Sequence, residues 1–147
     1  MITLNDEKIQ QSLKLFIVFS KAYRAVNECV NQHIQQHGLH PTEFAVLELL
    51  YHKGEQPLQQ IGEKILLASG SITYVVDKLE KKGFLRRAAC AKDRRVTYGQ
   101  VTEAGAKLME EIFPDHQKMI DEIMSVLSDD EKETAIHLLK KIGLSIQ

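Results

Sequence analysis

The sequence predicts a mainly α-helical fold with one small β-hairpin, and three observations support this prediction. Apolar residues recur at helical spacing through most of the 147 residues. The pattern changes to that of strands in one place, between residues 84 and 101. Two short helical segments joined by a tight turn precede this change, which is the order of a helix-turn-helix followed by a β-hairpin wing.

The other predictions depend on residues 69–83. Ser69 is expected to cap the start of a helix, and Gly83 to close it in the left-handed conformation. One helix face is apolar and consists of Ile72, Val75, Val76 and Leu79. The opposite face carries side chains of the kinds that reach base edges and phosphates, namely Ser71, Thr73, Tyr74, Asp77 and Lys78. Taken alone, the pattern favours an ordinary surface helix, and the neighbouring segments favour one that enters a DNA groove.

Three helices are predicted before this segment. A long first helix covers about residues 9–37 and ends at Gly38, and Pro41 suits the first turn of the second. Pro57 opens a short third helix, which forms the helix-turn-helix with the fourth. The run Leu-Phe-Ile-Val-Phe at 15–19 is apolar all round, so it must be buried on every side. In a chain this short, that burial is expected against a second copy.

The segment after Gly83 predicts the hairpin. Residues 84–87 and 96–101 have the composition of strands, and the charged residues 91–95 lie between them at the expected tip. A hairpin that follows a DNA-reading helix is a wing. Its basic tip can enter the minor groove, where the negative potential favours arginine.

Two further helices are predicted at the C-terminal end. Thr102 is expected to cap the first of them, Pro114 to kink it, and a capping box at 128–131 to start the last. The terminal helices carry more apolar surface than a small winged domain covers, so we expect them to pack together and against a partner subunit. The predicted organisation is one intertwined domain with a dimerisation helix at 1–40, a winged helix-turn-helix at 41–101 and dimerisation helices at 102–147.

The composition is that of a globular protein. The apolar fraction is 44%, and no apolar run approaches the roughly 20 residues of a membrane-spanning helix, so no membrane association is expected. Residues 1–8 lack the apolar region of a signal peptide, which predicts a cytoplasmic location. Cys29 and Cys90 are too few and too far apart for a disulfide framework.

The basic residues are concentrated in one part of the chain. Residues 64–100 contain nine lysines and arginines against three acidic residues, a net charge of +6 in a chain whose formal charge is −1. This distribution is typical of a nucleic-acid binder, and here it predicts double-stranded DNA as the partner. A winged-helix module that docks on proteins without specific DNA binding is the alternative, and it leaves the basic segment unexplained.

The sequence offers little support for enzymatic or metal chemistry. It has no phosphate-binding glycine loop and no Cys-x-x-Cys, so neither an enzyme nor a cofactor is expected. His33 and His37 are four residues apart with His40 nearby, a spacing that can bind zinc, but the ligand set is incomplete and no metal is expected. His116 lies on an apolar helix face, where a core histidine and a histidine lining a ligand pocket both stay open.

Three motifs carry a resemblance to a known family: Asp-Lys-Leu-Glu-Lys-Lys-Gly at 77–83, Lys-Asp-Arg-Arg at 92–95 and Val-Thr-Glu-Ala-Gly at 101–105. Together with the order of the predicted elements, they resemble the MarR family of bacterial transcriptional regulators. The resemblance implies a dimeric winged helix-turn-helix protein that binds a pseudo-palindromic operator, usually as a repressor. A ligand or an oxidant releases such a protein from DNA. The segments most similar to the MhqR type, which is associated with quinone and electrophile response, are 49–54, 57–62 and 67–79.

The resemblance assigns roles to residues of the helix and the wing. The wing arginine of the family falls on Arg95, with Asp93 as its ion-pair partner, and Arg94 fills a variable position. Tyr74 stands where the family often has an arginine, which favours a thymine methyl or phosphate contact over guanine readout. The expected DNA-binding residues are Ser69, Ser71, Thr73, Tyr74, Lys78, Lys92, Arg94 and Arg95.

The resemblance also implies a ligand between the dimerisation helices and the winged domain. In this chain the expected pocket residues are Tyr23, Cys29, Phe44, Leu47, Phe113 and His116. Aromatic and apolar walls with a few polar groups suit a small aromatic ligand such as a quinone or a phenol. Cys29 is expected to be buried and inert, whereas Cys90 lies among basic residues and is the candidate reactive thiol. Release by ligand binding and release by cysteine modification both stay open.

Overall fold

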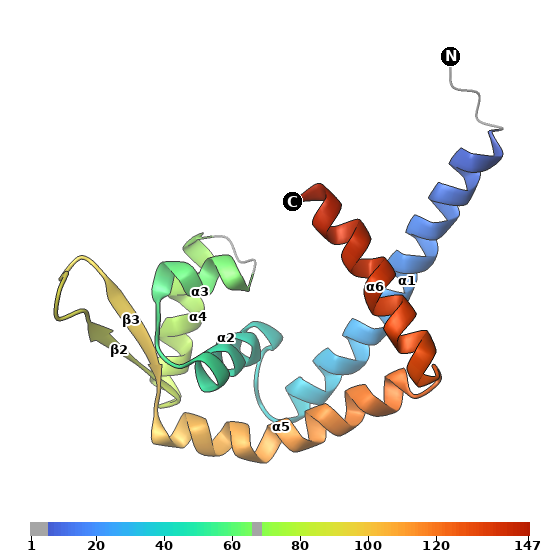
Figure 1. Ribbon diagram of the computed structural model, residues 1–147. Helices are drawn as coiled ribbons and strands as arrows, with labels where there is room; N and C mark the ends of the chain where they lie inside the picture. The colour runs from blue at the N-terminus through green and yellow to red at the C-terminus, as the bar shows by residue number, and fades with distance from the viewer. Residues whose placement is uncertain (1–5, 66–68) are drawn as a thin grey trace.

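A computed structural model describes residues 6–65 and 69–147, without the side chains of residues 69–71. Its elements are, in chain order, α1 (Glu7–Gln36), α2 (Pro41–Lys53), β1 (Gln56–Pro57), α3 (Leu58–Lys64), α4 (Ser69–Lys81), β2 (Leu85–Ala89), β3 (Thr97–Val101), α5 (Glu103–Met124) and α6 (Asp129–Ile146) (Figure 1). The prediction of a mainly helical fold with a small β-hairpin wing is confirmed.

The elements form two groups. The winged part consists of α2, α3, α4 and the sheet, and the arm consists of α1 and α6, which α5 joins to the winged part (Figure 1). Figure 1 shows α2, α3, α4 and the sheet together at the left, and α1 and α6 at the right. The helix α5 runs beneath both and connects them, and it curves along its length with Pro114 inside it. The fold therefore separates the predicted DNA-binding elements from the predicted dimerisation helices.

The sheet contains one strand that the sequence does not predict. Its order is β1-β3-β2, and both pairs are antiparallel. The strand β1 consists of Gln56 and Pro57, which pair with Gly99 and Tyr98 of β3. Pro57 therefore lies in a strand, and α3 begins one residue later, at Leu58.

The predicted capping residues close most of the helices. The hydroxyl of Ser128 accepts a hydrogen bond from the Glu131 amide, and Glu131 accepts one in return, so the predicted capping box is confirmed. Gly83 has a φ of +82°, the left-handed conformation expected after α4. The helix α4 begins at Ser69 itself. The predicted capping role of the Ser69 side chain lies outside the described residues.

The core of the winged part combines residues from α2, α3, α4 and α5. Its largest fully buried side chains are Leu47, Leu50, Ile61, Leu79, Met109, Ile112, Val46 and Val76. The apolar face predicted for α4 is buried in this core, including Ile72 and Val75. Burial of one face fixes α4 on the domain and leaves its polar face turned outward.

The start of α5 is joined to the corner between α4 and β2. The Thr102 hydroxyl donates to the Gly83 carbonyl over 2.6 Å and accepts from the Gly105 amide over 3.1 Å. The Thr102 amide donates to the carbonyl of Phe84. A Cβ atom at Gly105 would lie 2.2 Å from that carbonyl oxygen, so only glycine fits here. The Val-Thr-Glu-Ala-Gly motif thus fastens the arm to the winged part.

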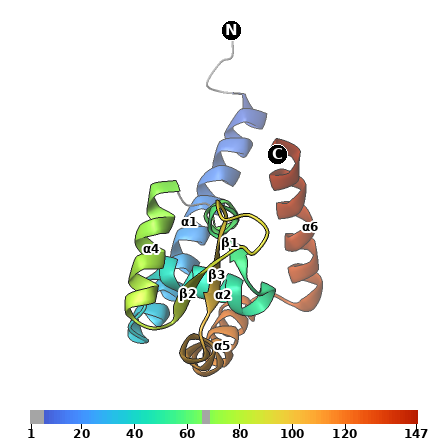
Figure 2. The same cartoon turned by 90° about the vertical axis from the view of Figure 1, so that its left-hand side faces the viewer.

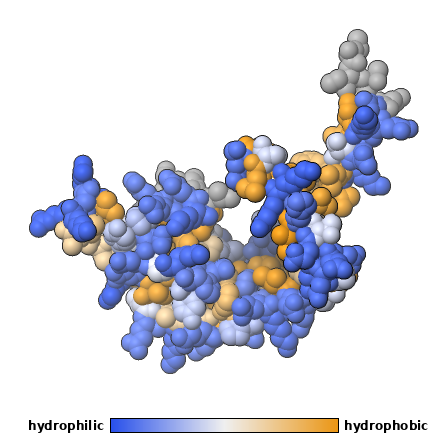
Figure 3. Space-filling view, in the orientation of Figure 1, coloured by the Kyte–Doolittle hydropathy of each residue, from blue (hydrophilic) through white to orange (hydrophobic). Residues whose placement is uncertain are grey.

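Within the single chain, the terminal helices do not form with each other the extensive contact that the sequence pattern predicts. The helix α1 packs on α2 and α5, whereas α6 makes no comparably extensive packing with any other described element. Figure 2 shows α1 and α6 as separate helices, because α5 carries α6 away from α1. Large apolar side chains on both are exposed in the single chain, among them Leu15, Phe16, Phe19, Leu138, Leu139, Ile142 and Leu144. Figure 3 shows hydrophobic surface along this arm and hydrophilic surface over the wing.

No helix among the described residues combines the length and the apolar character that crossing a membrane requires.

Candidate DNA-binding interface

The outward face of α4 presents polar and aromatic groups. Thr73, Tyr74 and Lys78 are exposed, with 60% of Tyr74 accessible to solvent. The Lys78 ammonium lies over the Tyr74 ring, 4.7 Å from its centroid, and a hydrogen bond with Tyr74 raises the pKa of Lys78. This helix face therefore offers a ring and a cation that are held together. The side chains of Ser69 and Ser71 lie outside the described residues.

The tip of the wing is held by the predicted ion pair. The carboxylate of Asp93 accepts hydrogen bonds from the Arg95 backbone amide at 3.0 Å and from its Nε at 3.1 Å. These bonds lower the pKa of Asp93, so the carboxylate stays charged. The Arg95 side chain is 91% exposed. Lys92 and Arg94 are exposed beside it.

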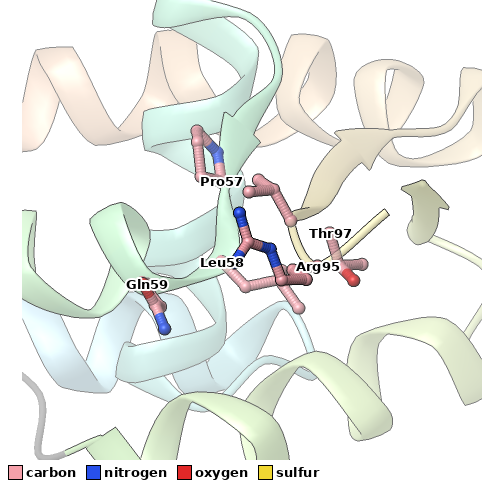
Figure 4. Close-up of a pocket in the computed structure, with 6 residues that line it drawn as sticks. Pro57, Leu58, Gln59, Arg95 and Thr97 are labelled. Carbon is pink, nitrogen blue, oxygen red and sulfur yellow. The ribbon is translucent and has the colours of Figure 1, made fainter. Parts of the chain in front are cut away.

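The helix and the wing lie side by side on the winged part. The strand β2 packs on α4, and Figure 2 shows α4 next to the β2–β3 hairpin. A hollow of about 220 Å³ at the base of the wing is lined by Pro57, Leu58, Gln59, Arg95, Val96 and Thr97 (Figure 4). The arginine of the wing therefore lies close to the start of the helix-turn-helix.

Arg87 of β2 forms a contact that was not predicted from the sequence. Its guanidinium binds the carboxylates of Asp77 and Glu80 on α4, with 2.6 Å between Nη2 and the Asp77 oxygen. Hydrogen bonding to Asp77 is the largest cause of the raised pKa of Arg87. The signal in the sequence that could have indicated this contact is the pair of acidic residues, three positions apart, on a helix whose other charged residues are basic. The positive charge of this arginine is therefore balanced within the protein.

Lys82 forms a second link across the domain. Its ammonium lies 2.9 Å from the carboxylate of Glu43 and 3.4 Å from the carbonyl oxygen of Gly38. Glu43, which is only 3% exposed, also accepts a hydrogen bond from the His40 amide at the start of α2. The end of α4 is thereby connected to the corner between α1 and α2.

A hollow opens where α1, α2 and α5 meet. It has a volume of about 440 Å³ and is lined by Asn27, Val30, Asn31, Ile34, Pro41, Thr42, Phe44, Ala45, Glu48, Ile65, His116 and Ile120. His116 also borders a neighbouring hollow of about 400 Å³ on α5, together with Phe113. Apolar walls with a few amide, carboxylate and imidazole groups are the usual lining of a small-molecule site.

Comparison with known proteins identifies the family. The family model described as "MarR family" matches residues 39–97. The chain is 65% identical over 136 residues to the HTH-type transcriptional regulator MhqR of Bacillus subtilis (strain 168), covering 92% of this chain and 94% of that protein. This chain belongs to the MarR family. It is a transcriptional regulator and, as predicted, not an enzyme.

Solved structures share the fold of this MarR-family regulator. The S. aureus MepR–DNA complex has a TM-score of 0.79 at 22% identity, covering 89% of this chain and 96% of that one. The structure of NadR in complex with 4-hydroxyphenylacetate has a TM-score of 0.74 at 21% identity, covering 97% and 96%. The winged helix-turn-helix assigned from the sequence is therefore the fold of the family.

The structure brings only part of the predicted ligand pocket together. Phe44 lines the first hollow and Phe113 the second, and the ring of His116 lies between them, 4.9 Å and 5.9 Å from their centroids. Leu47 is fully buried in the core and has no surface toward either hollow. Tyr23 is exposed on α1 and lines neither hollow, because it lies before the turn where α5 crosses α1.

Burial determines the chemistry of the histidine in this regulator. His116 is 7% exposed, and desolvation lowers its pKa, which favours the neutral imidazole. Its Nδ1 is buried and has no hydrogen-bond partner in the described chain, and the same holds for Nε2 of His33. The two rings stack at 6.4 Å. The His116 imidazole, which lines both hollows, therefore has a polar atom without a hydrogen-bond partner among the described residues.

The burial of one of the two thiols differs from the prediction. Cys29 is exposed, whereas the sequence pattern predicted a buried thiol, because no described helix or strand covers its side chain on α1. Cys90 is half-buried, and its amide donates to the Val96 carbonyl at the base of the wing tip. The described residues contain no cluster of three metal-binding side chains.

Proposed function

We propose that this regulator is a repressor that binds a pseudo-palindromic operator as a homodimer and leaves it when a small aromatic ligand occupies the hollow between α1, α2 and α5. One observation carries the DNA-binding part: the exposed face of α4 and the exposed Arg95 of the wing belong to one winged part, in which β2 packs on α4. Such a unit places a helix in the major groove and an arginine in the adjacent minor groove. The DNA complex of MepR, which has the same fold, supports this proposal.

Exposed apolar surface supports the dimer. Residues 15–19 of α1 are exposed on all sides in the single chain, and α6 exposes apolar side chains along its length. Large contiguous apolar patches mark protein interfaces. A second copy that covers both helices places the two α4 helices at a fixed separation, which predicts half-sites about one helical turn apart. Sedimentation at micromolar concentration tests the dimer, and a monomer there would overturn it.

The operator contact is tested at the wing. Arg95→Ala should weaken operator binding by about 1–3 kcal/mol, because a desolvated arginine contact in the minor groove is lost. Lys118→Ala removes an exposed cation on α5, remote from the wing, and serves as the control. The operator is first obtained by sequencing DNA fragments that the purified protein selects. Selection of no common sequence would favour the protein-docking module instead.

The ligand is proposed from the chemistry of the hollow. Phe44 and His116 provide ring surfaces in this hollow, and the unpartnered Nδ1 of His116 provides a polar atom. A phenol or a quinone combines a ring with an oxygen that can pair with an imidazole. The complex of NadR with 4-hydroxyphenylacetate, a phenol, supports this ligand class. A tenfold loss of operator affinity needs a preference of only about 1.4 kcal/mol for the released conformation.

Release by ligand binding is tested against release by thiol modification. A double variant, Cys29→Ser with Cys90→Ser, is exposed to 1,4-benzoquinone while it is bound to the operator. We expect it to dissociate as the wild type does, because the hollow remains intact. If only the wild type responds, alkylation of a thiol replaces the pocket in this proposal. His116→Phe keeps the ring but removes the polar atom, and it should weaken the response in both backgrounds.

A further inference from the structure

Arg87 bridges two acidic residues on one side of α4. Its Nη2 lies 2.6 Å from the Asp77 carboxylate and its Nη1 binds Glu80. The two acids are three positions apart and therefore lie on the same side of the helix, one turn from each other. The arginine side chain is 30% exposed, which is far less than that of Arg95 at the wing tip. Its guanidinium fork thus spans a full turn of α4 from a neighbouring strand.

This bridge connects the two elements that are proposed to contact DNA. Arg87 lies in the middle of β2, opposite Gly99 of β3, and the same two strands carry the tip with Arg95. Asp77 belongs to the helix that carries Tyr74. The position of the wing relative to α4 decides whether both reach neighbouring grooves at once. The bridge is therefore placed to set the spacing between helix and wing.

The bridge also neutralises acidic groups near the DNA. The Asp77 side chain is 52% exposed on a helix that is proposed to enter the major groove. Without a cation it would repel phosphates, and so would Glu80. A phosphate that attracted Arg87 would have to draw it from both carboxylates and leave them unpaired. An arginine in this arrangement suits an internal role better than a DNA contact.

We propose that Arg87 is a positioning residue for operator binding, which holds the wing against α4 through Asp77 and Glu80 and makes no DNA contact of its own. The proposal rests on the DNA-binding function proposed above. A wild-type protein that selects no operator would refute that function, whereas each variant below is measured against a wild type that binds. The two failures are therefore distinguishable.

The test is a double-mutant cycle on operator affinity. Arg87→Gln should weaken binding about tenfold or more, because two carboxylates are left without their cation. The same substitution in an Asp77→Asn, Glu80→Gln background should change affinity less than about threefold, since the groups it would leave unpaired are already neutral. An equal loss in both backgrounds would overturn the proposal, because a phosphate contact does not depend on the acids.

Arg86→Gln is the matched control. This neighbouring arginine is exposed, and its Nε donates to the Gln100 side chain over 2.8 Å, a contact that does not include Asp77 or Glu80. Its effect on affinity should be the same in both backgrounds. Arg87→Lys provides a second variant that keeps the charge. One ammonium cannot span both carboxylates as the fork does, so this variant should lose affinity, whereas a phosphate contact would tolerate lysine.

Footprinting gives a readout that does not depend on overall affinity. At saturating protein, Arg87→Gln should lose hydroxyl-radical protection of the minor groove beside each half-site, and the same loss is expected of Arg95→Ala. Protection of guanine N7 in the major groove should persist, since α4 stays on its core. A footprint unchanged in both grooves would show that Arg87 does not position the wing, and it would refute the proposal even if every variant bound more weakly.

Discussion

Gly105→Ala tests how the arm is fastened to the winged part. The added Cβ would lie 2.2 Å from the Phe84 carbonyl oxygen and 2.8 Å from a Val101 methyl group. Both separations are below the 3.4 Å at which ordinary contact begins, the first by more than 1 Å. Because a carbonyl oxygen of the main chain is the closest atom, a side-chain rotation cannot relieve the clash. The start of α5 must move away from the corner after α4.

The expected cost follows from these contacts. Inserting a methyl group into a packed site costs about 1–3 kcal/mol. The hydrogen bonds of Thr102 to Gly83 and Phe84 weaken as α5 moves, and each contributes about 1 kcal/mol. Alanine recovers about 0.5–1 kcal/mol over glycine within a helix. We therefore expect a net loss of about 1–3 kcal/mol in the free energy of unfolding.

Guanidinium unfolding at one fixed protein concentration measures this loss, since the proposed dimerisation would make stability concentration-dependent. Gly62→Ala is the matched control, because the Cβ added to this α3 glycine would meet Ile72 of α4 at 3.5 Å, an ordinary contact. This variant should be as stable as the wild type or up to about 1 kcal/mol more stable. If Gly105→Ala is no less stable than Gly62→Ala, the joint between Gly105 and Phe84 does not fix α5.

Three further outcomes are expected. Lys82→Met should cost about 1–3 kcal/mol in unfolding free energy, because the buried Glu43 carboxylate loses its cation, and the cost should shrink in a Glu43→Gln background. Thr102→Val should lose about 1–2 kcal/mol whereas Thr102→Ser should not, since only the hydroxyl caps α5. Burial lowers the pKa of His116 below 6.5, so the unfolded chain binds more protons at mildly acidic pH. The contribution of His116 to the free energy of unfolding therefore keeps its full value above pH 6.5 and decreases as the pH falls through and below that value. Thermal melts between about pH 8 and pH 5 should show a smaller decrease in stability for His116→Phe than for the wild type. Equal declines in the two proteins would exclude His116 as the source.

The sequence predicts features that depend on neighbouring residues. The buried face of α4, the Thr102 cap and the Asp93–Arg95 pair involve residues within a few positions of each other, and the two wing strands follow one another in the chain with one short charged segment between them. Their geometry follows from helical period, turn chemistry and hydrogen bonds to nearby main-chain groups. These predictions do not require knowledge of how the helices dock.

Features that depend on docking could not be predicted in the same way. Lys82 and Glu43 are 39 positions apart, and they meet only because the end of α4 lies over the corner before α2. The strand β1 exists only because β3, about forty residues later, lies beside Gln56. The expected pocket also depended on where α5 crosses α1, and this crossing leaves Tyr23 and Cys29 outside the hollows.

The division of α4 into a buried and an exposed face has a consequence for how operator preference changes in evolution. Thr73 and Tyr74 are exposed, so mutations at these two proposed DNA contacts are expected to alter base readout while the stability of the domain stays intact. Asp77 differs, since the bridge to Arg87 links it to the wing. A lineage is therefore expected to change its operator by successive single substitutions at Thr73 and Tyr74. Asp77 should change only together with Arg87.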